Sequence, residues 1–379
     1  MNRESNCDIA VGECLAKIAR QPKVKTTDYL ESGAFPVIDQ GTKFVGGYVN
    51  DESLLYTGPL PVVIFGDHNR HIKFVKSPFA VGADGTQLLY PDERFEISYF
   101  YYAIRALPLK NYGYERHFKY LKEERLRVWP LDVQRRIAAI LSAYDDLIEN
   151  NTRRIAILEE MARRIYEEWF VRFRFPGHEG VRMVDSELGL VPEGWRVTRF
   201  TDVFDVRYGK GLGTKDLLAD GQYPVYGAGG VIGRYDSFIA EGPTCLITSR
   251  GNGSGTVWRT VEKAFVTNNS FLVYPKADFT GLNFGFAELF AGQANVKTVV
   301  SGSAQPQLTL DGLAGLQVIA PERAVLVRFD ALVSPMFDLA NKLHFVIRNL
   351  RTTRDLLLPK LISGELDLSA VPEPEALAA

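Results

Sequence analysis

The chain contains an internal repeat, and this repeat restricts the possible folds more than any other feature of its 379 residues. Segment 33–41, GAFPVIDQG, resembles segment 221–229, GQYPVYGAG, at a shift of 188 positions (221 − 33). Segment 144–158, YDDLIENNTRRIAIL, aligns with 336–350, MFDLANKLHFVIRNL, at a shift of 192 (336 − 144). Between them lie shorter matches in the same order, Gly58-Pro59 with Gly242-Pro243 and Leu89-Tyr90-Pro91 with Val273-Tyr274-Pro275. Because self-similarity at a fixed shift is typical of repeated units, the sequence predicts a tandem duplication.

Each repeat begins with a strand-rich region and ends with a long helix. Residues 8–130 and 195–320 carry short apolar runs punctuated by Gly and Pro, a pattern typical of buried strands. Long helical segments follow near Pro130 and near Pro321, and proline is common at helix starts. The stretch 175–180, which contains Pro and two Gly residues, predicts a connector between the repeats.

Both helical segments carry a heptad pattern, in which apolar residues alternate steps of four and three. Sustained over this length, the pattern indicates coiled-coil packing, although two helices packed on unrelated sheets remain an alternative. In the second segment Arg354 interrupts the apolar series, and Pro335 and Pro359 are expected to kink or end the helix. The predicted coiled-coil seam consists of Ile137, Leu141, Tyr144, Ile148, Ile155, Leu158, Ile165, Phe329, Val333, Leu343, Ile347, Leu350 and Leu357.

The composition is that of a globular protein, with 46% hydrophobic and 24% charged residues. No apolar run reaches the length of a membrane span, and no signal-peptide pattern begins the chain. Three unclustered cysteines, Cys7, Cys14 and Cys245, match neither a disulfide framework nor a zinc site, so we expect a cytoplasmic protein. The net charge of −2 neither supports nor excludes nucleic-acid binding.

The sequence contains no recognisable catalytic motif. Adenine methyltransferases would require a glycine-rich loop and a [DN]PP[YF]-like tetrad, and neither occurs as a complete pattern. Walker A, GxSxG, HExxH and CxxC patterns are also missing. Segment 227–233, GAGGVIG, has Ile232 where a dinucleotide-binding loop would place its third glycine, so a hairpin turn explains it better.

Two corresponding loops are candidates for a binding site. Segment 67–71, DHNRH, follows a buried strand, and its Arg, Asn and His side chains suit contact with base edges and phosphates. Its two histidines could instead ligate a metal, but Arg70 would place an unopposed cation at the ion. The loop 249–254, SRGNGS, has the same place in the second repeat, and its glycines allow a ligand to approach the backbone. Solvated hairpin tips are the plain alternative for both.

Several motifs, in this order, resemble the DNA-specificity subunit of type I restriction-modification systems. They are VIFGDH at 63–68, FAVGADG at 79–85, RHFKYL at 116–121, VWPLDVQRRI at 128–137, VPEGW at 191–195, GSAQPQ at 302–307 and LPKLISGEL at 358–366. The resemblance covers residues 8–368. It implies an α+β fold with two β-rich target recognition domains, separated by two long antiparallel coiled-coil helices with pseudo-two-fold symmetry.

This resemblance implies five segments. They are target recognition domain 1 (1–130), a first spacer helix (131–175), a connector with target recognition domain 2 (176–320), a second spacer helix (321–364) and a disordered tail (365–379). It also implies a chain without catalytic residues, metal or cofactor. The partners would be double-stranded DNA with a bipartite site, two modification methyltransferase subunits and restriction motor/nuclease subunits. S-adenosylmethionine and ATP would bind to those partners.

Under this interpretation each repeat reads one half of the DNA site through polar and basic loop residues. The expected DNA-contacting residues are Lys43, His68, Asn69, Arg70, Lys73, Arg116 and His117 for the first half-site, and Lys210, Arg250, Asn252, Ser254, Asn268, Asn269 and Gln307 for the second. Two alternatives remain open at this point. The chain could be a duplicated protein-interaction scaffold without direct DNA contact, or an enzyme with an unfamiliar site.

Overall fold

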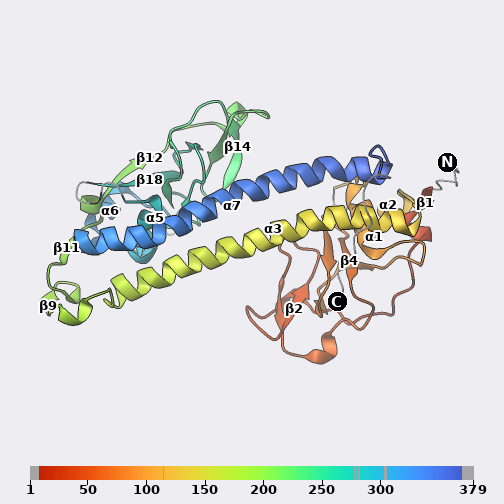
Figure 1. Cartoon of the computed structure of the whole chain (residues 1–379), viewed down its shortest axis with the longest axis horizontal. Helices are drawn as coiled ribbons and strands as arrows, with labels where there is room; N and C mark the ends of the chain where they lie inside the picture. The colour runs from red at the N-terminus through yellow and green to blue at the C-terminus, as the bar shows by residue number, and fades with distance from the viewer. Residues whose placement is uncertain (1–7, 114, 277–278, 280–281, 303–304, 369–379) are drawn as a thin grey trace. The chain divides into compact units, whose positions relative to one another are not determined.

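The computed structural model describes residues 8–113, 115–276, 279, 282–302 and 305–368. The chain forms two compact units, each made from two stretches of sequence (Figure 1). The first unit consists of residues 1–149 and 348–379, and the second of residues 150–347. Each unit therefore contains one β-rich region together with part of both long helices, so the units do not coincide with the segments expected from the sequence.

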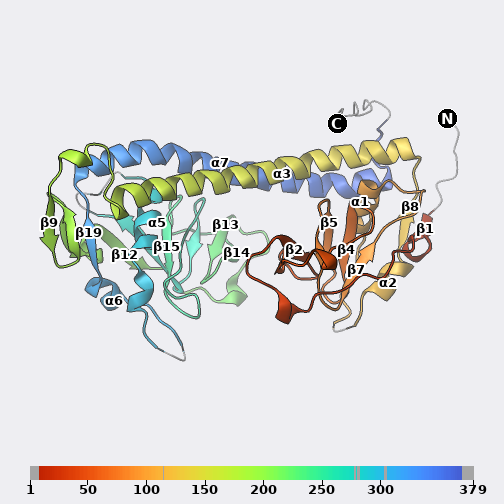
Figure 2. The same ribbon diagram turned by 90° about the horizontal axis from the view of Figure 1, so that it is seen from below.

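The β-rich region of the first unit contains three small sheets (Figure 2). Its helices are α1 (Ile97–Ala106) and α2 (Phe118–Glu123). The first sheet pairs β1 (Asp8–Ala10) with β8 (Arg125–Arg127). The second has the order β3 (Gly47–Val49), β2 (Phe35–Ile38) and β6 (Ala80–Val81). The third has the order β5 (Ile72–Val75), β4 (Val62–Gly66) and β7 (Thr86–Leu89).

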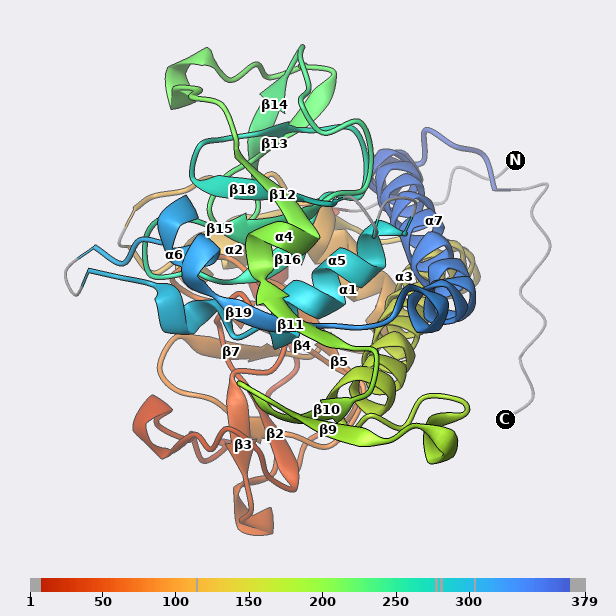
Figure 3. The ribbon, with the colours of Figure 1, turned by 90° about the vertical axis from the view of Figure 1, so that its left-hand side faces the viewer.

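The β-rich region of the second unit contains the corresponding sheets and an added hairpin (Figure 3). Its helices are α4 (Phe200–Val203), α5 (Phe284–Gln293) and α6 (Leu310–Gly315). One sheet pairs β11 (Arg196–Arg199) with β19 (Gln317–Ala320), and a second has the order β14 (Val231–Tyr235), β13 (Tyr223–Tyr226) and β17 (Phe265–Val266). A third has the order β12 (Phe204–Tyr208), β18 (Ser270–Pro275), β15 (Cys245–Thr248) and β16 (Val257–Arg259). The added hairpin pairs β9 (Met183–Ser186) with β10 (Gly189–Pro192).

The two β-rich regions share one strand order. The order β3-β2-β6 corresponds to β14-β13-β17, and in each the central strand pairs antiparallel with one neighbour and parallel with the other. The order β5-β4-β7 likewise corresponds to β16-β15-β18, to which the second unit adds β12 at the edge of β18. The repeat detected in the sequence is therefore also a repeat of element order.

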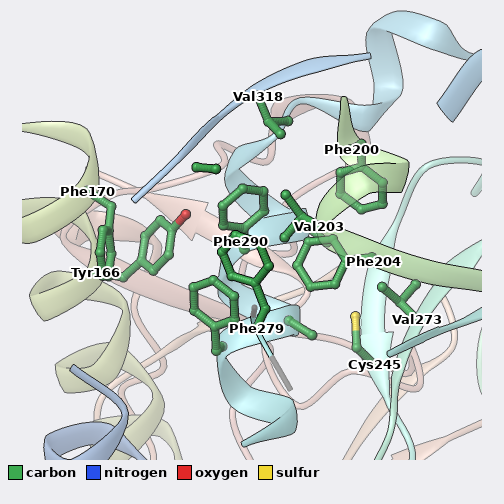
Figure 4. Close-up of a cluster of buried hydrophobic side chains, with 14 of the residues drawn as sticks. Tyr166, Phe170, Phe200, Val203, Phe204, Cys245, Val273, Phe279, Phe290 and Val318 are labelled. Atoms are coloured by element: carbon green, nitrogen blue, oxygen red, sulfur yellow. The ribbon is translucent and has the colours of Figure 1, made fainter. Parts of the chain in front are cut away.

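The apolar runs of β4 and β15 are buried on both faces, which explains why their sequences do not alternate with polar residues. In β4, Val63 and Phe65 face one hydrophobic cluster while Val62 and Ile64 face another. In β15, Cys245 and Ile247 belong to the large core, whereas Leu246 belongs to a second, smaller cluster. Figure 4 shows this large core of the second unit, in which aromatic rings from α3, α4 and α5 meet.

Two long helices carry the predicted heptads. Helix α3 spans Leu131–Tyr166 and α7 spans Arg323–Ser363. In the first unit Ile137 and Leu141 of α3 share a cluster with Leu358 and Leu361 of α7. In the second unit the end of α3 instead shares a cluster with the beginning of α7, through side chains that include Tyr166 and Phe329. All residues of the predicted seam are buried or half-buried.

The first long helix ends earlier than the predicted edge at residue 175. A π-helical turn, Glu167–Val171, follows α3, and Phe173 then adopts a left-handed conformation with φ 57°. Because a π turn holds more residues than an α turn, it shifts the heptad register. As a result Phe170 is buried while Trp169, which continues the heptad in the sequence, is half-buried.

Neither proline ends the second long helix, contrary to the expectation from the sequence. Helix α7 continues through Pro335 and Pro359 to Ser363. Proline has no backbone N–H, so Pro335 and Pro359 cannot donate to the carbonyl groups four residues earlier, those of Ala331 and Asp355. All four residues lie on the exposed side of the helix. Water can hydrate carbonyl groups on this side, so the missing hydrogen bonds do not terminate the helix.

The chain remains ordered beyond the second helix for a few residues. Gly364 ends α7 with φ 76°, and Leu368 packs against the core of the first unit. The predicted disordered tail therefore begins too early at 365, and residues 369–379 lie outside the described part of the chain. Of the helices in the described ranges, none is both long and apolar enough to span a membrane.

Candidate nucleic-acid interface

In the first unit the β4–β5 loop, residues 67–71, is held by a buried carboxylate. The side chain of Asp67 is 2% exposed and accepts a hydrogen bond from the backbone amide of Phe118 at 2.8 Å. Its own amide donates to the carbonyl of Gly85 at 2.8 Å, and its carbonyl accepts from the amide of His117 at 2.7 Å. Asp67 thus ties the loop to two distant segments and has a structural role.

The side chain of Gln40 joins the tip of this loop to the β2 end. Its amide oxygen accepts a hydrogen bond from the backbone of His68 at 3.1 Å, and its amide nitrogen donates to the carbonyl of Asp84 at 3.0 Å. The Asn69 side chain donates to the Gln40 carbonyl and accepts from the His71 amide at 3.0 Å. Sequence reasoning missed Gln40, although it lies in the repeated motif at 33–41.

Arg70 and His117 are more constrained than the sequence suggested. Arg70 has φ 62° and donates through Nη1 to the carbonyl of Leu109 at 2.8 Å. His117 is 2% exposed; its Nε2 accepts from the backbone amide of Tyr112 at 3.1 Å, and its Nδ1 lies 3.0 Å from the carbonyl oxygen of Asp67. Since Nε2 is an acceptor, Nδ1 carries the proton and donates to that carbonyl.

Lys73 is also inside the structure instead of on its surface. Its ammonium group donates to the carbonyl of Lys43 at 2.5 Å and lies 3.6 Å from Asp39. Burial lowers the pKa of Lys73, and the nearby Asp39 carboxylate opposes that change. Lys73 and His117 hold the loops in place and have no free polar surface for DNA.

Four segments of the first unit thus meet around Gln40 and Asp67, and we call residues 39–44, 67–71, 84–85 and 109–118, apart from 114, the first loop group. Its members predicted to contact DNA differ in exposure. Lys43, His68 and Arg116 are exposed, whereas Asn69 and Arg70 are half-buried.

In the second unit the predicted residues come from four segments that backbone hydrogen bonds bring together. Lys210 accepts from the amide of Asn268 at 3.1 Å, and the amide of Ser249 donates to Asn269 at 2.8 Å. Arg250 forms a β-bridge with Gln307. We call residues 209–210, 249–255, 266–269 and 305–307 the second loop group.

Two residues of this group have structural roles that limit substitution. Ser254 is buried, and its hydroxyl donates to the carbonyl of Pro306 at 2.8 Å, so it fixes the loop rather than facing solvent. A Cβ at Gly209 would lie 2.2 Å from the carbonyl oxygen of Thr267, which explains glycine before Lys210. In contrast Lys210, Arg250 and Asn252 are exposed, and Asn268, Asn269 and Gln307 are half-buried.

In the second unit, the residue that corresponds to Gln40 also supports a loop. At the shift of 188 it corresponds to Ala228, whose carbonyl accepts from the Thr248 hydroxyl at 2.7 Å. Thr248 is the last residue of β15, directly before the second loop. In both units the repeated motif therefore supports the loop that follows the central buried strand.

Both loop groups present hydrogen-bond donors and acceptors on exposed loops. Within the described ranges, no group of three or more His, Cys, Asp or Glu side chains is placed to hold a metal ion. The two described cysteines, Cys14 and Cys245, are buried and free, and burial raises the pKa of the Cys245 thiol well above its ordinary value. Exposed Arg, Lys, His and Asn side chains on loops suit base-edge and phosphate contact.

Comparison with known proteins finds similarity to one class of protein. Residues 192–324 match the family described as type I restriction modification DNA specificity domain. The chain is 26% identical over 330 residues to the type I restriction enzyme MjaIX specificity subunit of Methanocaldococcus jannaschii, which covers 78% of this chain and 75% of that protein. It is also 26% identical over 147 residues to the MjaVIII specificity subunit of the same organism, 39% of this chain and 28% of that protein.

A solved structure extends the similarity to the fold of almost the whole chain. The S subunit of a type I restriction-modification system from M. genitalium covers 96% of this chain and 97% of its own, with a TM-score of 0.59 and 16% identity. This likeness shows a shared mixed α/β fold. In sequence and in fold, the chain is similar to specificity subunits of type I restriction-modification systems.

Proposed function

We propose that this chain is the sequence-specific DNA-binding specificity subunit of a type I restriction-modification complex and performs no chemistry itself. The observation that carries the proposal is the repeat of one β-rich topology, in which each copy presents a loop group of exposed basic and amide side chains. Two copies of one reading module suit a DNA target with two separate specified halves.

Within each loop group we assign base reading to the exposed and half-buried side chains. In the first they are Lys43, His68, Asn69, Arg70 and Arg116, and in the second Lys210, Arg250, Asn252, Asn268, Asn269 and Gln307. Arginine and lysine pair with guanine, and asparagine and glutamine pair with adenine, in the major groove. We assign no DNA contact to Lys73, His117 and Ser254, because they are buried and support the loops from inside.

We infer that α3 and α7 form an antiparallel coiled coil that relates the two reading modules by approximate two-fold symmetry. The buried seam and the pairing of opposite helix ends inside each unit support this arrangement. The modules would correspond to target recognition domains at 1–130 and 176–320, and the helices to spacers within 131–175 and 321–364.

The proposed partners are those that the similarity to type I specificity subunits implies. Two modification methyltransferase subunits would bring S-adenosylmethionine, and restriction motor/nuclease subunits would bring ATP, so this chain would need no cofactor of its own. The complex would act in the cytoplasm, where thiols such as those of Cys14 and Cys245 stay reduced. A chain with net charge −2 would then share phosphate contacts with its partners.

Methylome sequencing tests the proposal directly. A host that expresses the chain with its methyltransferase partner should gain one bipartite methylated motif, and a host with the partner alone should not. If the motif is the same with and without this chain, the chain is a scaffold without direct DNA contact. Methyl transfer or cleavage by the purified chain alone would contradict its non-catalytic role.

A further inference from the structure

Each unit contains one buried arginine that joins the long helices to a helix of the β-rich region. In the first unit Arg354 of α7 pairs with Asp145 of α3, and the hydroxyl of Tyr102 in α1 donates to the same carboxylate at 2.7 Å. Arg105 of α1 lies 3.7 Å from Asp145 and 3.4 Å from Asp355 of α7. We call these five residues the Arg354 cluster.

In the second unit Arg259 of β16 joins the long helices to α5 in a corresponding way. It pairs with Glu159 of α3 and, at 2.8 Å through Nη1, with Glu288 of α5. Its guanidinium carbon lies 5.3 Å from the ring centre of Phe337 in α7, a distance typical of cation–π contact. These four residues form the Arg259 cluster.

The two clusters did not arise by copying one ancestral contact. At the shift of 192, Asp145 corresponds to Phe337 (145 + 192), and Arg354 corresponds to Ala162 (354 − 192). The two positions that form the buried ion pair in the first unit thus hold apolar side chains in the second. Each unit nevertheless joins α3, α7 and its own β-rich helix around one arginine.

Because these ion pairs are buried, they restrict the orientation of their partners more than ion pairs on the surface do. The side chains of Arg259 and Arg354 are only 9% and 10% exposed, whereas the Lys76–Asp146 pair of the first unit is 62% and 63% exposed. A buried arginine that loses its partner carries a large desolvation penalty, while an exposed pair contributes little. The planar guanidinium also fixes the direction of each partner, so the clusters restrict orientation as well as distance.

We propose that the Arg354 and Arg259 clusters are positioning elements that fix the orientation of each reading module on the two helices, and thereby the spacing that the protein accepts between half-sites. This inference rests on the proposed function. Base readout by the loop groups is separate from this orientation, because no residue of either cluster belongs to a loop group. Weakening a cluster should therefore relax spacing while the specified bases stay the same.

The test is the methylome of cells that express the full complex with Arg354→Met or Arg259→Met. We expect the same two half-site sequences, with methylation also at spacers one base pair shorter or longer than in the unaltered protein. Relative to native spacing, methylation at these altered spacers should rise on the order of tenfold, the size of discrimination that one misplaced DNA contact gives. The matched control is Lys76→Met, which removes an exposed ion pair between the first β-rich region and α3 and should leave the spacing unchanged.

A double variant separates positioning from folding. Asp145→Leu with Arg354→Met replaces the buried pair by apolar side chains, which leaves no unpaired charge. If this variant methylates only the native spacing, or if both it and Arg354→Met lose all methylation, the positioning role is overturned. A change in the half-site bases would overturn it as well. If the unaltered chain specifies no bipartite motif, the proposed function itself fails, and the two failures remain distinguishable.

Discussion

Insertion of a heptad into both long helices should lengthen the spacer between the two half-sites of the DNA target. Helix α3 passes from the first unit to the second between residues 149 and 150, and α7 returns between residues 347 and 348. Seven residues added at each of these points restore the a/d pattern of the seam. They also leave the contacts within each unit intact, including both arginine clusters.

The expected size of the effect follows from helix geometry. Seven residues at 1.5 Å each add about 10 Å of helix. DNA rises roughly 3.4 Å for each base pair, so the accepted spacer should grow by about 3 base pairs. The specified bases of both half-sites should stay the same, because the loop groups are untouched.

Methylome sequencing with a library of spacer lengths measures this change. Insertion of seven residues into α3 alone is the control, and it should abolish methylation because the two helices no longer match in length. A folded double-insertion variant that methylates only the original spacing would refute the idea that the helices determine the spacer. The helical content and thermal melting of the variant establish that it is folded.

Four further outcomes are expected. Arg250→Ala should relax base preference in one half-site and leave the other intact in the methylome, because Arg250 is exposed in the second loop group only. Replacing residues 8–130 with those of a relative should change the other half-site, and a change in both halves would contradict independent reading. Phe329→Ala should cost about 3–5 kcal/mol in chemical unfolding, since this ring is fully buried among aromatic side chains, and Val327→Ala, at an exposed position, should cost far less. The raised pKa of Cys245 keeps its thiol protonated, so a thiol reagent at pH 8 should modify it only upon unfolding, and rapid labelling of Cys245 itself, located by peptide mapping of the native chain, would disagree with its burial.

The repeat and the long helices could be predicted from sequence because both leave periodic signals. Matches such as 33–41 with 221–229 require only comparison of the chain with itself, and the heptads survive in each helix. Details that depend on one conformation left no such signal. The π turn at Glu167–Val171 has no periodic signature in the sequence, and the continuation of α7 through Pro335 depends on which side of that helix faces water.

Site residues could be assigned to the right loops from sequence, but their exposure could not. The polar character of Lys73 and His117 suggested surface contact, whereas the fold buries both against backbone carbonyls from distant segments. Residue type alone cannot distinguish a DNA contact from a buried backbone contact, because the same side-chain donors can form hydrogen bonds with either. Gln40 shows the reverse case, since its support of the β4–β5 loop depends on contacts 28 and 44 residues away.

The near-neutral net charge is compatible with DNA binding because the chain distributes its charges unevenly. Along α3, Arg136, Arg163 and Arg164 pair with acids one turn away, and Arg163 and Arg164 lower the pKa of Glu160 to about 2. Lys43, Arg116, Lys210 and Arg250 differ, for in the described part of the chain they have no acidic side chain within 4.0 Å. Paired charges on a helix contribute little to a distant field, whereas unpaired cations on exposed loops can contact phosphates and base edges directly. The unpaired cations of the two loop groups are therefore compatible with DNA contact despite the total of −2.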